Sequence, residues 1–317
     1  MTIATTASGA WAQYLARCVL VVGAIASPLV HAQPVSATDD SGNTVSLPAP
    51  AQRVISLAPH ITELVYAAGA GDKLVGVVSY SDYPPQAKTL PIIGSNNSLD
   101  LEGIVALHPD LVIVWPHDNA QPQIDRLRAL HIPLFFSAPR RLDDVATSLQ
   151  RIGTLLGTES TAQTAASEYR LKIDRLRAHY AHRPTVDVFY QVWDNPLMTL
   201  NGTQFISDVI AMCGGRNVFA NLPSAVTTLS TESVLASAPE AIVSASPGVT
   251  APEKHRQSLE RWLAWPTLTA VARGNLFTID GDLINRPAPR LAQGAARLCE
   301  DLEEARLRRP TGGAAPR

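Results

Sequence analysis

The chain alternates short apolar runs with amphipathic stretches of helical periodicity. Apolar runs of strand length occupy 53–58, 111–115, 186–192 and 241–244. Helical stretches follow the first and third of these runs, at 61–68 and 205–213. Helical segments placed between buried strands are typical of parallel α/β sheets, which helices cover on both faces. The pattern therefore predicts an α/β fold.

An internal repeat divides the chain into two similar parts. Residues 99–114 align with 229–244, and the identical positions are Leu99/Leu229, Glu102/Glu232, Ala106/Ala236 and Pro109/Pro239. Asp100 and Ser230 are residue types that cap helix N-termini, and a proline ends each helix before an apolar strand. The repeat predicts two lobes, each built around a helix, a turn and a parallel strand.

A long polar segment, 159–182, connects the two parts. It holds no Pro or Gly, and pairs of opposite charge four residues apart (Glu168/Lys172 and Arg170/Asp174) favour an exposed helix. An apolar face recurs at Tyr169, Ile173, Leu176 and Tyr180. We expect two Rossmann-like lobes with parallel sheets joined by one long rigid α-helix. A rigid connector implies small relative motion, and the cleft between the lobes is the expected ligand site.

The first residues have the pattern of a secretory signal peptide. Arg17 precedes an apolar run, 19–29, that is too short for the ~20 residues of a membrane-spanning helix, and Val30-His31-Ala32 fits a cleavage site. The expected segments are a signal peptide (1–32), an N-terminal lobe (33–158), a connecting helix (159–182), a C-terminal lobe (183–307) and a disordered tail (308–317). The expected location is the periplasm. The mature chain keeps two cysteines, Cys213 and Cys299, and a disulfide between them is the simplest interpretation in an oxidising compartment.

Composition excludes several classes of protein. With 26 Lys and Arg against 28 Asp and Glu, the net charge is −2, and no basic run offers a surface for nucleic acid. With 46% hydrophobic residues, the chain is long and apolar enough to bury a large core. Its length suggests two domains.

Motifs that would indicate catalysis are missing. Gly69, Gly71 and Gly76 have the wrong spacing for a dinucleotide site, and neither a Walker motif nor a Gly-x-Ser-x-Gly nucleophile elbow occurs. A metal receptor would need several His and carboxylate ligands drawn from both lobes. His60 and His117 follow strand ends of the first lobe, where an ordinary loop residue is the simpler interpretation of His60, and no histidine lies near a strand end of the second. We expect no enzyme, no metal site and no resident cofactor.

Aromatic residues gather at the predicted strand ends instead. Tyr80 and Tyr83 flank a turn, Trp115 ends a first-lobe strand, and Trp193 ends the matching strand of the second lobe. Packing beneath loops is the competing interpretation for each. Together they favour a cleft for a large flat ligand.

Seven segments carry a resemblance to a known family. They are 53–64, 79–87, 101–115, 191–196, 212–219, 232–239 and 285–291. The chain resembles, over about residues 53–303, the periplasmic cobalamin-binding proteins of ABC importers, within the helical-backbone class of siderophore, haem and corrinoid receptors. Leu-x-Pro-x-x-Thr-Glu and Pro-Asp-Leu-Val are shared by the wider class, whereas Ser-Tyr-Ser-Asp-Tyr-Pro-Pro and the paired cysteines are more particular to cobalamin binders.

The resemblance implies roles for individual residues. Tyr80, Trp115 and Trp193 would line a corrin pocket, and Asp282 with Arg286 would reach the corrin's amide rim, although a salt bridge within the loop is the competing interpretation. Glu102 and Glu232 would dock the two permease subunits of an ABC transporter that also carries ATPase subunits. Each could instead complement a helix dipole.

Two positions depart from the family pattern. Asn96 and Val226 stand where cobalamin binders often carry Trp, so the sequence leaves the preferred corrinoid open and predicts a more open pocket. The expected ligand is cobalamin or a related corrinoid such as cobinamide. The alternative is a haem or siderophore receptor of the same fold, with Tyr80 or His60 as an axial haem ligand.

Overall fold

The structure is a computed structural model that describes residues 1–3, 33–95, 98–116, 121–246 and 259–310. The chain divides into two units, residues 1–32 and 33–317. The predicted signal peptide lies outside the described residues except for Met1–Ile3, so it stays a prediction, as does cleavage after Ala32. Among the residues described, no helix is long and apolar enough to span a membrane.

The first lobe, our name for the described residues between 33 and 158, is built on a four-stranded parallel sheet of order β4-β3-β5-β6. Its strands are β3 (Val54–Ser56), β4 (Leu74–Val77), β5 (Leu111–Val114) and β6 (Leu134–Phe136). Its helices are α1 (Pro59–Ala67), α2 (Leu101–Ala106), α3 (Gln121–Ala129) and α4 (Leu142–Leu156). An antiparallel hairpin, β1 (Val35–Thr38) and β2 (Thr44–Leu47), packs against α4.

The second lobe, the described residues between 183 and 310, contains a parallel sheet of order β10-β7-β12-β13. Its strands are β7 (Val186–Gln191), β10 (Gly215–Asn217), β12 (Ala241–Ser246) and β13 (Leu276–Asp280). A small antiparallel sheet holds β8 (Trp193–Asp194), β9 (Leu197–Leu200) and β11 (Val226–Thr228). The helices are α6 (Phe205–Met212), α7 (Thr231–Ser237), α9 (Thr269–Ala272), α10 (Gly281–Ile284) and α11 (Leu291–Leu307).

The repeat found in the sequence has the predicted local structure. The Asp100 carboxylate accepts from the Gly103 N–H at the start of α2, and the Ser230 hydroxyl accepts from the Ser233 N–H at the start of α7. Both helices end before their prolines, and β5 and β12 follow. Each of these strands pairs in parallel with the first strand of its lobe's parallel sheet, β3 or β7. The α/β fold with two parallel-sheet lobes is therefore confirmed.

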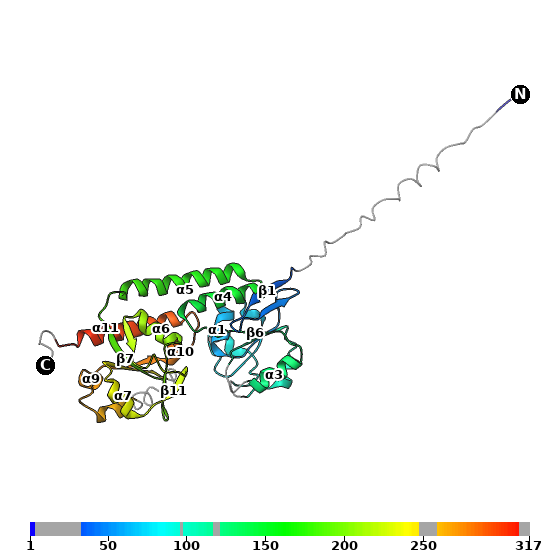
Figure 1. The fold of residues 1–317 in the computed structure, drawn as a ribbon. Coiled ribbons are helices and arrows are strands. Elements are labelled where there is room, and N and C mark those ends of the chain that lie inside the picture. The colour runs from blue at the N-terminus through cyan, green and yellow to red at the C-terminus, as the bar shows by residue number, and fades with distance from the viewer. Residues whose placement is uncertain (4–32, 96–97, 117–120, 247–258, 311–317) are drawn as a thin grey trace. The chain divides into compact units, whose positions relative to one another are not determined.

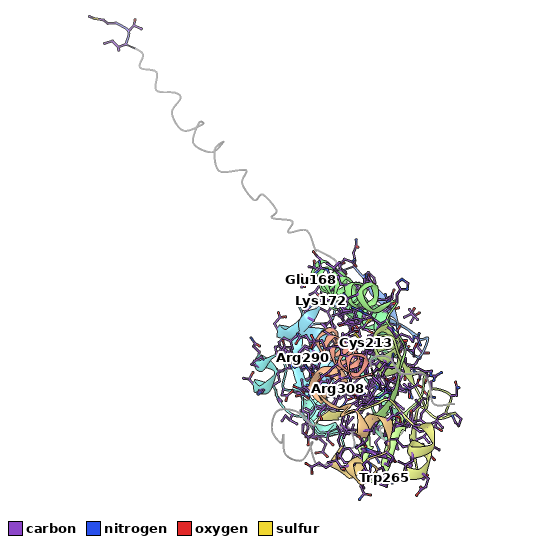
Figure 2. The ribbon with its side chains drawn as sticks, turned by 90° about the vertical axis from the view of Figure 1, so that its left-hand side faces the viewer. Glu168, Lys172, Cys213, Trp265, Arg290 and Arg308 are labelled. Carbon is purple, nitrogen blue, oxygen red and sulfur yellow. A yellow bond between two sulfur atoms is a disulfide. The ribbon has the colours of Figure 1, made fainter. Side chains whose placement is uncertain are left out.

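The long helix α5 (Glu159–Tyr180) follows the predicted segment closely. It packs along α4 and against α11 (Figure 1). Its apolar face is buried at Tyr169, Ile173 and Tyr180. Glu168 and Lys172 lie on its exposed side (Figure 2). One hydrophobic core extends from the first lobe through this face into the second. The exact lobe boundaries stay a prediction.

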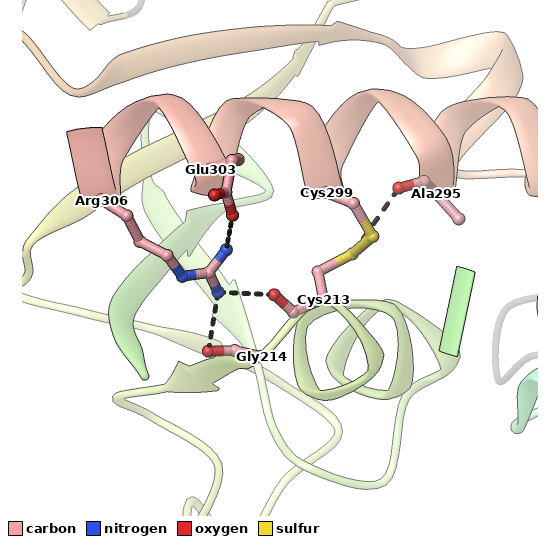
Figure 3. Close-up of a disulfide and its surroundings, with 6 residues drawn as sticks. All are labelled: Cys213, Gly214, Ala295, Cys299, Glu303 and Arg306. Carbon is pink, nitrogen blue, oxygen red and sulfur yellow. Dashed lines mark hydrogen bonds and ion pairs between the residues drawn. A yellow bond between two sulfur atoms is a disulfide. The ribbon is translucent and has the colours of Figure 1, made fainter. Parts of the chain in front are cut away.

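The predicted disulfide joins Cys213, which caps α6, to Cys299 in α11 across 86 residues of sequence (Figure 3). Arg306 reinforces this junction, because its guanidinium donates to the carbonyl oxygens of Cys213 (2.7 Å) and Gly214 (3.2 Å) and pairs with Glu303 at 2.9 Å. The end of α6 is thus attached to α11 by a covalent bond and by hydrogen bonds.

The ordered chain continues beyond the predicted start of the disordered tail. Arg308 pairs with Glu304, and Arg309 pairs with Glu240 at 2.6 Å. The Arg308 pair lies within the last turn of α11, whereas the Arg309 pair joins the segment after α11 to the residue directly before β12. Residues 311–317, the rest of the predicted tail, lie outside the described residues.

Candidate functional site

A cavity of about 440 Å³ lies between the two lobes. The first lobe contributes the residues that directly follow β3, β4, β5 and β6, and the second lobe contributes the start of α6 and the segment 285–287. Parallel strands present their carboxyl ends at one edge of a sheet, and ligands of open α/β sheets bind there. The predicted cleft therefore exists, and the first-lobe topology determines its position.

Two of the predicted aromatic residues line this cavity. Trp115 follows β5 directly and is 41% exposed, and Tyr80 follows β4 and is 79% exposed. Tyr80 has a φ of 67°, which is uncommon for a residue with a side chain. The exposed part of this aromatic pair offers apolar surface beside the cavity.

His60 also lines the cavity, but it is not the loop residue that the sequence suggested. It lies in the first turn of α1, directly after Pro59, and is only 5% exposed. Its ring meets that of Trp115 edge to face, with 5.6 Å between the centroids. Burial lowers the pKa of His60 to about 4, a hydrogen bond to the Ser137 backbone opposes this shift, and the charge of Arg286 adds to it. The imidazole is therefore neutral at physiological pH.

Arg286 lines the cavity while three carboxylates hold it. Its guanidinium contacts Glu63 at 3.2 Å, Asp82 at 2.9 Å and Asp282 at 2.7 Å. The Asp282 contact is the loop salt bridge that the sequence left as an alternative. Asp282 itself belongs to α10, a short helix, and is absent from the cavity lining.

The same ion-pair cluster connects the two lobes. Glu63 of α1 has a side chain only 2% exposed, and it pairs with Arg290 of the second lobe through contacts of 2.6 and 2.9 Å. The guanidinium of Arg290, which is labelled in Figure 2, lies over the Tyr83 ring, 3.8 Å from its centroid. Breaking one partner of a buried ion pair typically costs about 3–5 kcal/mol, because the other charge is left unpaired, so loss of Arg290 would leave the buried Glu63 charge less compensated between the lobes.

Sequence reasoning did not assign Glu63 or Arg290 a role. Both belong to segments that carry the family resemblance: Glu63 ends the Leu-x-Pro-x-x-Thr-Glu element, and Arg290 is the last residue but one of 285–291. The available signal was a charged residue in each of two motifs that lie far apart in sequence, acidic in one and basic in the other. Only the three-dimensional arrangement shows that the two motifs contact each other.

Trp193 and Val226 lie outside the cavity lining. They occupy the edge strands β8 and β11 of the small antiparallel sheet, and both pair with β9. Trp193 is 56% exposed and Val226 is 45% exposed, and the Trp193 indole N–H donates to the Asn195 carbonyl oxygen at 2.9 Å. Asn96 lies outside the described residues.

The two predicted docking residues, Glu102 and Glu232, lie in the first turns of the equivalent helices α2 and α7. Their surroundings differ. Glu102 borders an apolar groove between α2 and α3, lined by Leu101, Val105 and Leu130 among others. Glu232 borders a polar hollow that includes Asp194 and Arg261. Hydrogen bonds from its own backbone N–H and the Ser230 hydroxyl lower the pKa of Glu232. Both carboxylates are exposed, as docking residues must be.

No group of three or more His, Cys, Asp or Glu side chains gathers to hold a metal ion within the described part of the chain. The cavity thus combines aromatic surface, a neutral imidazole and an arginine whose charge is compensated. This arrangement suits a bulky ligand with apolar faces and a polar rim.

Comparison with known proteins agrees with the geometry. A family model described as periplasmic binding protein matches residues 54–283. A vitamin B12-binding protein of Vibrio parahaemolyticus is 35% identical over 262 residues, which cover 82% of this chain and 92% of the relative.

Solved structures give the same picture. The crystal structure of the periplasmic vitamin B12 binding protein BtuF of Vibrio cholerae has a TM-score of 0.75 and 35% identity, and the match covers 81% of this chain and 98% of that one. A periplasmic heme binding protein from Pseudomonas aeruginosa has a TM-score of 0.67 and 27% identity, and the match covers 78% and 91% of the two chains. These relatives are binding proteins, which confirms the prediction of a non-enzymatic role. The matched length, the identity and the shared two-lobe fold lead to one conclusion: the chain belongs to the periplasmic binding protein family.

Proposed function

We propose that this protein captures cobalamin or a related corrinoid between its lobes in the periplasm and delivers it to the permease of an ABC transporter with its ATPase subunits. The observation that carries the proposal is the cavity at the strand ends, where Trp115 and Tyr80 present aromatic surface beside Arg286. The names of the relatives that match along most of the chain support the same ligand.

The chemistry of a corrinoid suits these side chains. Its ring is broad and flat, so aromatic faces can bury it, and its rim carries neutral amides that need hydrogen bonds and no full counter-charge. Arg286 already has carboxylate partners, so it can donate remaining N–H groups to an amide oxygen without bringing an uncompensated charge into the site. Asp282 pairs with Arg286. It would therefore either orient the Arg286 guanidinium or contact the amide rim of the corrinoid itself.

A corrinoid is larger than the cavity of about 440 Å³, so part of the ligand must extend beyond it. Exposed aromatic side chains around the opening would contact that part. Tyr80 is the most exposed of them, and Trp193 would contribute from the second lobe. The substitution of Val226 for a bulky aromatic residue leaves more room on the same small sheet.

Isothermal titration calorimetry with cyanocobalamin tests the binding function. One site per chain and a negative heat-capacity change are expected, because the aromatic surface becomes buried. Leu263→Ala removes an exposed apolar side chain outside the cavity lining and serves as the control, with unchanged affinity. No heat and no retention of cyanocobalamin by the wild-type chain would contradict the proposal.

A haem receptor is the second candidate. His60 and Tyr80, two side chains able to coordinate iron, both line the cavity, and one relative of known structure is a heme binding protein. Haemin binding that is lost in Tyr80→Phe or His60→Ala, with no corrinoid binding, would favour this alternative.

Docking to the permease would use Glu102 and Glu232. The repeat places them at matching positions on α2 and α7, and each borders a surface hollow that a partner could fill. A helix-dipole role alone would be worth well under ~1 kcal/mol on the surface. Changing both to Lys should abolish vitamin uptake in cells and leave ligand affinity intact. Glu168→Lys on the exposed side of α5 is the matched control, and unaltered transport in the double variant would leave only the dipole role.

A further inference from the structure

Arg140 brings a second arginine to the cavity between the lobes, beside Arg286. The guanidinium of Arg286 is paired with three carboxylates. The guanidinium of Arg140 makes neither an ion pair nor a hydrogen bond within the described part of the chain, although its backbone N–H donates to the Asp144 carboxylate at 2.9 Å. Arg140 therefore carries a positive charge that the described protein leaves uncompensated.

Backbone contacts hold Arg140 at the cavity. It follows the buried Pro139, and Asp144 accepts hydrogen bonds from the backbone N–H groups of both Arg140 and Arg141 at the start of α4. The neighbouring side chain, that of Arg141, pairs with Asp208 of α6 at 2.8 Å. The carboxylates of Asp144 and Asp208 thus have other partners, and the Arg140 side chain is the one of the two that lines the cavity.

The ion-pair cluster around Arg286 is a poor place for an anion. In this cluster the carboxylates of Glu63, Asp82 and Asp282 surround the guanidinium groups of Arg286 and Arg290, so negative charge is in excess. Among the described residues, no aspartate or glutamate lines the cavity itself. A negatively charged group of a ligand would therefore find its counter-charge at Arg140.

Ligand binding changes the surroundings of Arg140. The side chain is exposed without ligand, so water can solvate it, as it does most surface arginines. A bulky ligand in the cavity displaces that water, and an unpaired charge is costly to bury. A ligand with a negative group offsets this cost, because the planar guanidinium binds phosphate oxygens through paired, charge-assisted hydrogen bonds.

We propose that Arg140 binds the phosphodiester in the nucleotide tail of a complete corrinoid such as cobalamin. The inference rests on the proposed function, since it requires a corrinoid in this cavity. The amides on the rim of the ring are neutral, so the phosphodiester is the anionic group outside the cobalt centre. Cobinamide lacks the nucleotide tail, so Arg140 makes the cavity selective for cobalamin over cobinamide.

Calorimetric titration with matched ligands tests the proposal. Cyanocobinamide keeps the ring and the rim amides of cyanocobalamin but has no phosphodiester. In Arg140→Gln, cyanocobalamin affinity should fall about tenfold, because charge-assisted hydrogen bonds are lost, whereas cyanocobinamide affinity should stay within about twofold. Unchanged cyanocobinamide binding also shows that the variant is folded. Cobinamide phosphate, which has the phosphate without the base, should lose affinity in Arg140→Gln as cyanocobalamin does.

Two further variants and a change of salt separate charge pairing from other roles. Arg140→Lys keeps the positive charge and should recover most of the cyanocobalamin affinity, which loss of stacking by a planar guanidinium would not allow. Arg175→Gln removes the same charge from the exposed side of α5, outside the cavity lining, and should bind as wild type does. Added salt should weaken cyanocobalamin binding to the wild-type chain more than to Arg140→Gln.

Three results would overturn the inference and leave the corrinoid function standing. The first is unchanged cyanocobalamin affinity in Arg140→Gln, which would make Arg140 a solvated surface residue. The second is an equal loss of affinity for cyanocobalamin and cyanocobinamide, which would indicate a contact with the ring or its amides. The third is an equal effect of Arg175→Gln. Failure of the wild-type chain to bind either corrinoid would instead refute the function itself.

Discussion

The two lobes share a sheet, a repeat and two helix caps, yet they use this framework differently. The first lobe provides the side chains that can face a ligand: His60, Tyr80 and Trp115, at the carboxyl ends of its strands. The second lobe carries the disulfide between α6 and α11 and, in α11, the buried carboxyl of Asp301. The repeat gives both lobes a similar backbone. The side chains placed on that backbone determine whether a lobe contacts a ligand or carries stabilising contacts.

Removing the disulfide should produce the largest change. Cys213→Ser with Cys299→Ser frees a loop of 86 residues in the unfolded chain, and the stability lost should be about 4 kcal/mol. Urea unfolding followed by circular dichroism measures this loss. Hydrogen exchange should show that protection falls first in α6 and α11. Equal loss of protection in α1 and α2 would show that the second lobe is not specifically stabilised.

Asp301 should make the second lobe sensitive to pH. Burial raises the pKa of Asp301 to about 7, despite Arg297 at 2.7 Å. The folded chain therefore binds more protons than the unfolded chain between pH 4 and 7, and stability falls as pH rises through that range. Asp301→Asn should add about 3 kcal/mol at pH 8 and almost nothing at pH 4. Thermal unfolding at both pH values checks this, and an equal effect at the two would contradict the burial argument.

The aromatic residues of the two lobes should differ in their effect on binding. Trp115→Ala should weaken corrinoid binding by about 2 kcal/mol, as for a central anchor, because it lines the cavity. Trp193→Ala should cost less than ~1 kcal/mol, since that residue lies on an edge strand outside the cavity lining. Calorimetric titration of both variants shows which substitution weakens corrinoid binding more. The reverse order would mean that the second lobe provides the main binding surface.

Much of the fold could be predicted from the sequence because its signals are local. Helix caps at Asp100 and Ser230, the prolines of the repeat and the apolar face of 159–182 each act within a few residues of sequence. The disulfide was predictable because only two cysteines lie outside the predicted signal peptide. Local patterns therefore sufficed for the elements and for one covalent bond.

The rest depended on tertiary contacts that no local pattern encodes. The sequence suggested that Arg286 reaches a ligand, but it could not show that Glu63 from the other lobe and Asp82 hold its guanidinium. It treated His60 as a loop residue, because a residue after Pro59 can either start a helix or continue a turn. It predicted Trp193 as a ligand contact, and it could not show that Trp193 lies on a small separate sheet outside the cavity lining.

The central claim is that the aromatic cleft of this protein selects a corrinoid. The mature protein would be mixed with one equivalent each of cyanocobalamin and haemin, separated from free ligand by gel filtration, and measured by visible absorption. The cobalamin bands are expected in the protein fraction, at one equivalent per chain. A protein fraction that shows only the haem Soret band would contradict it.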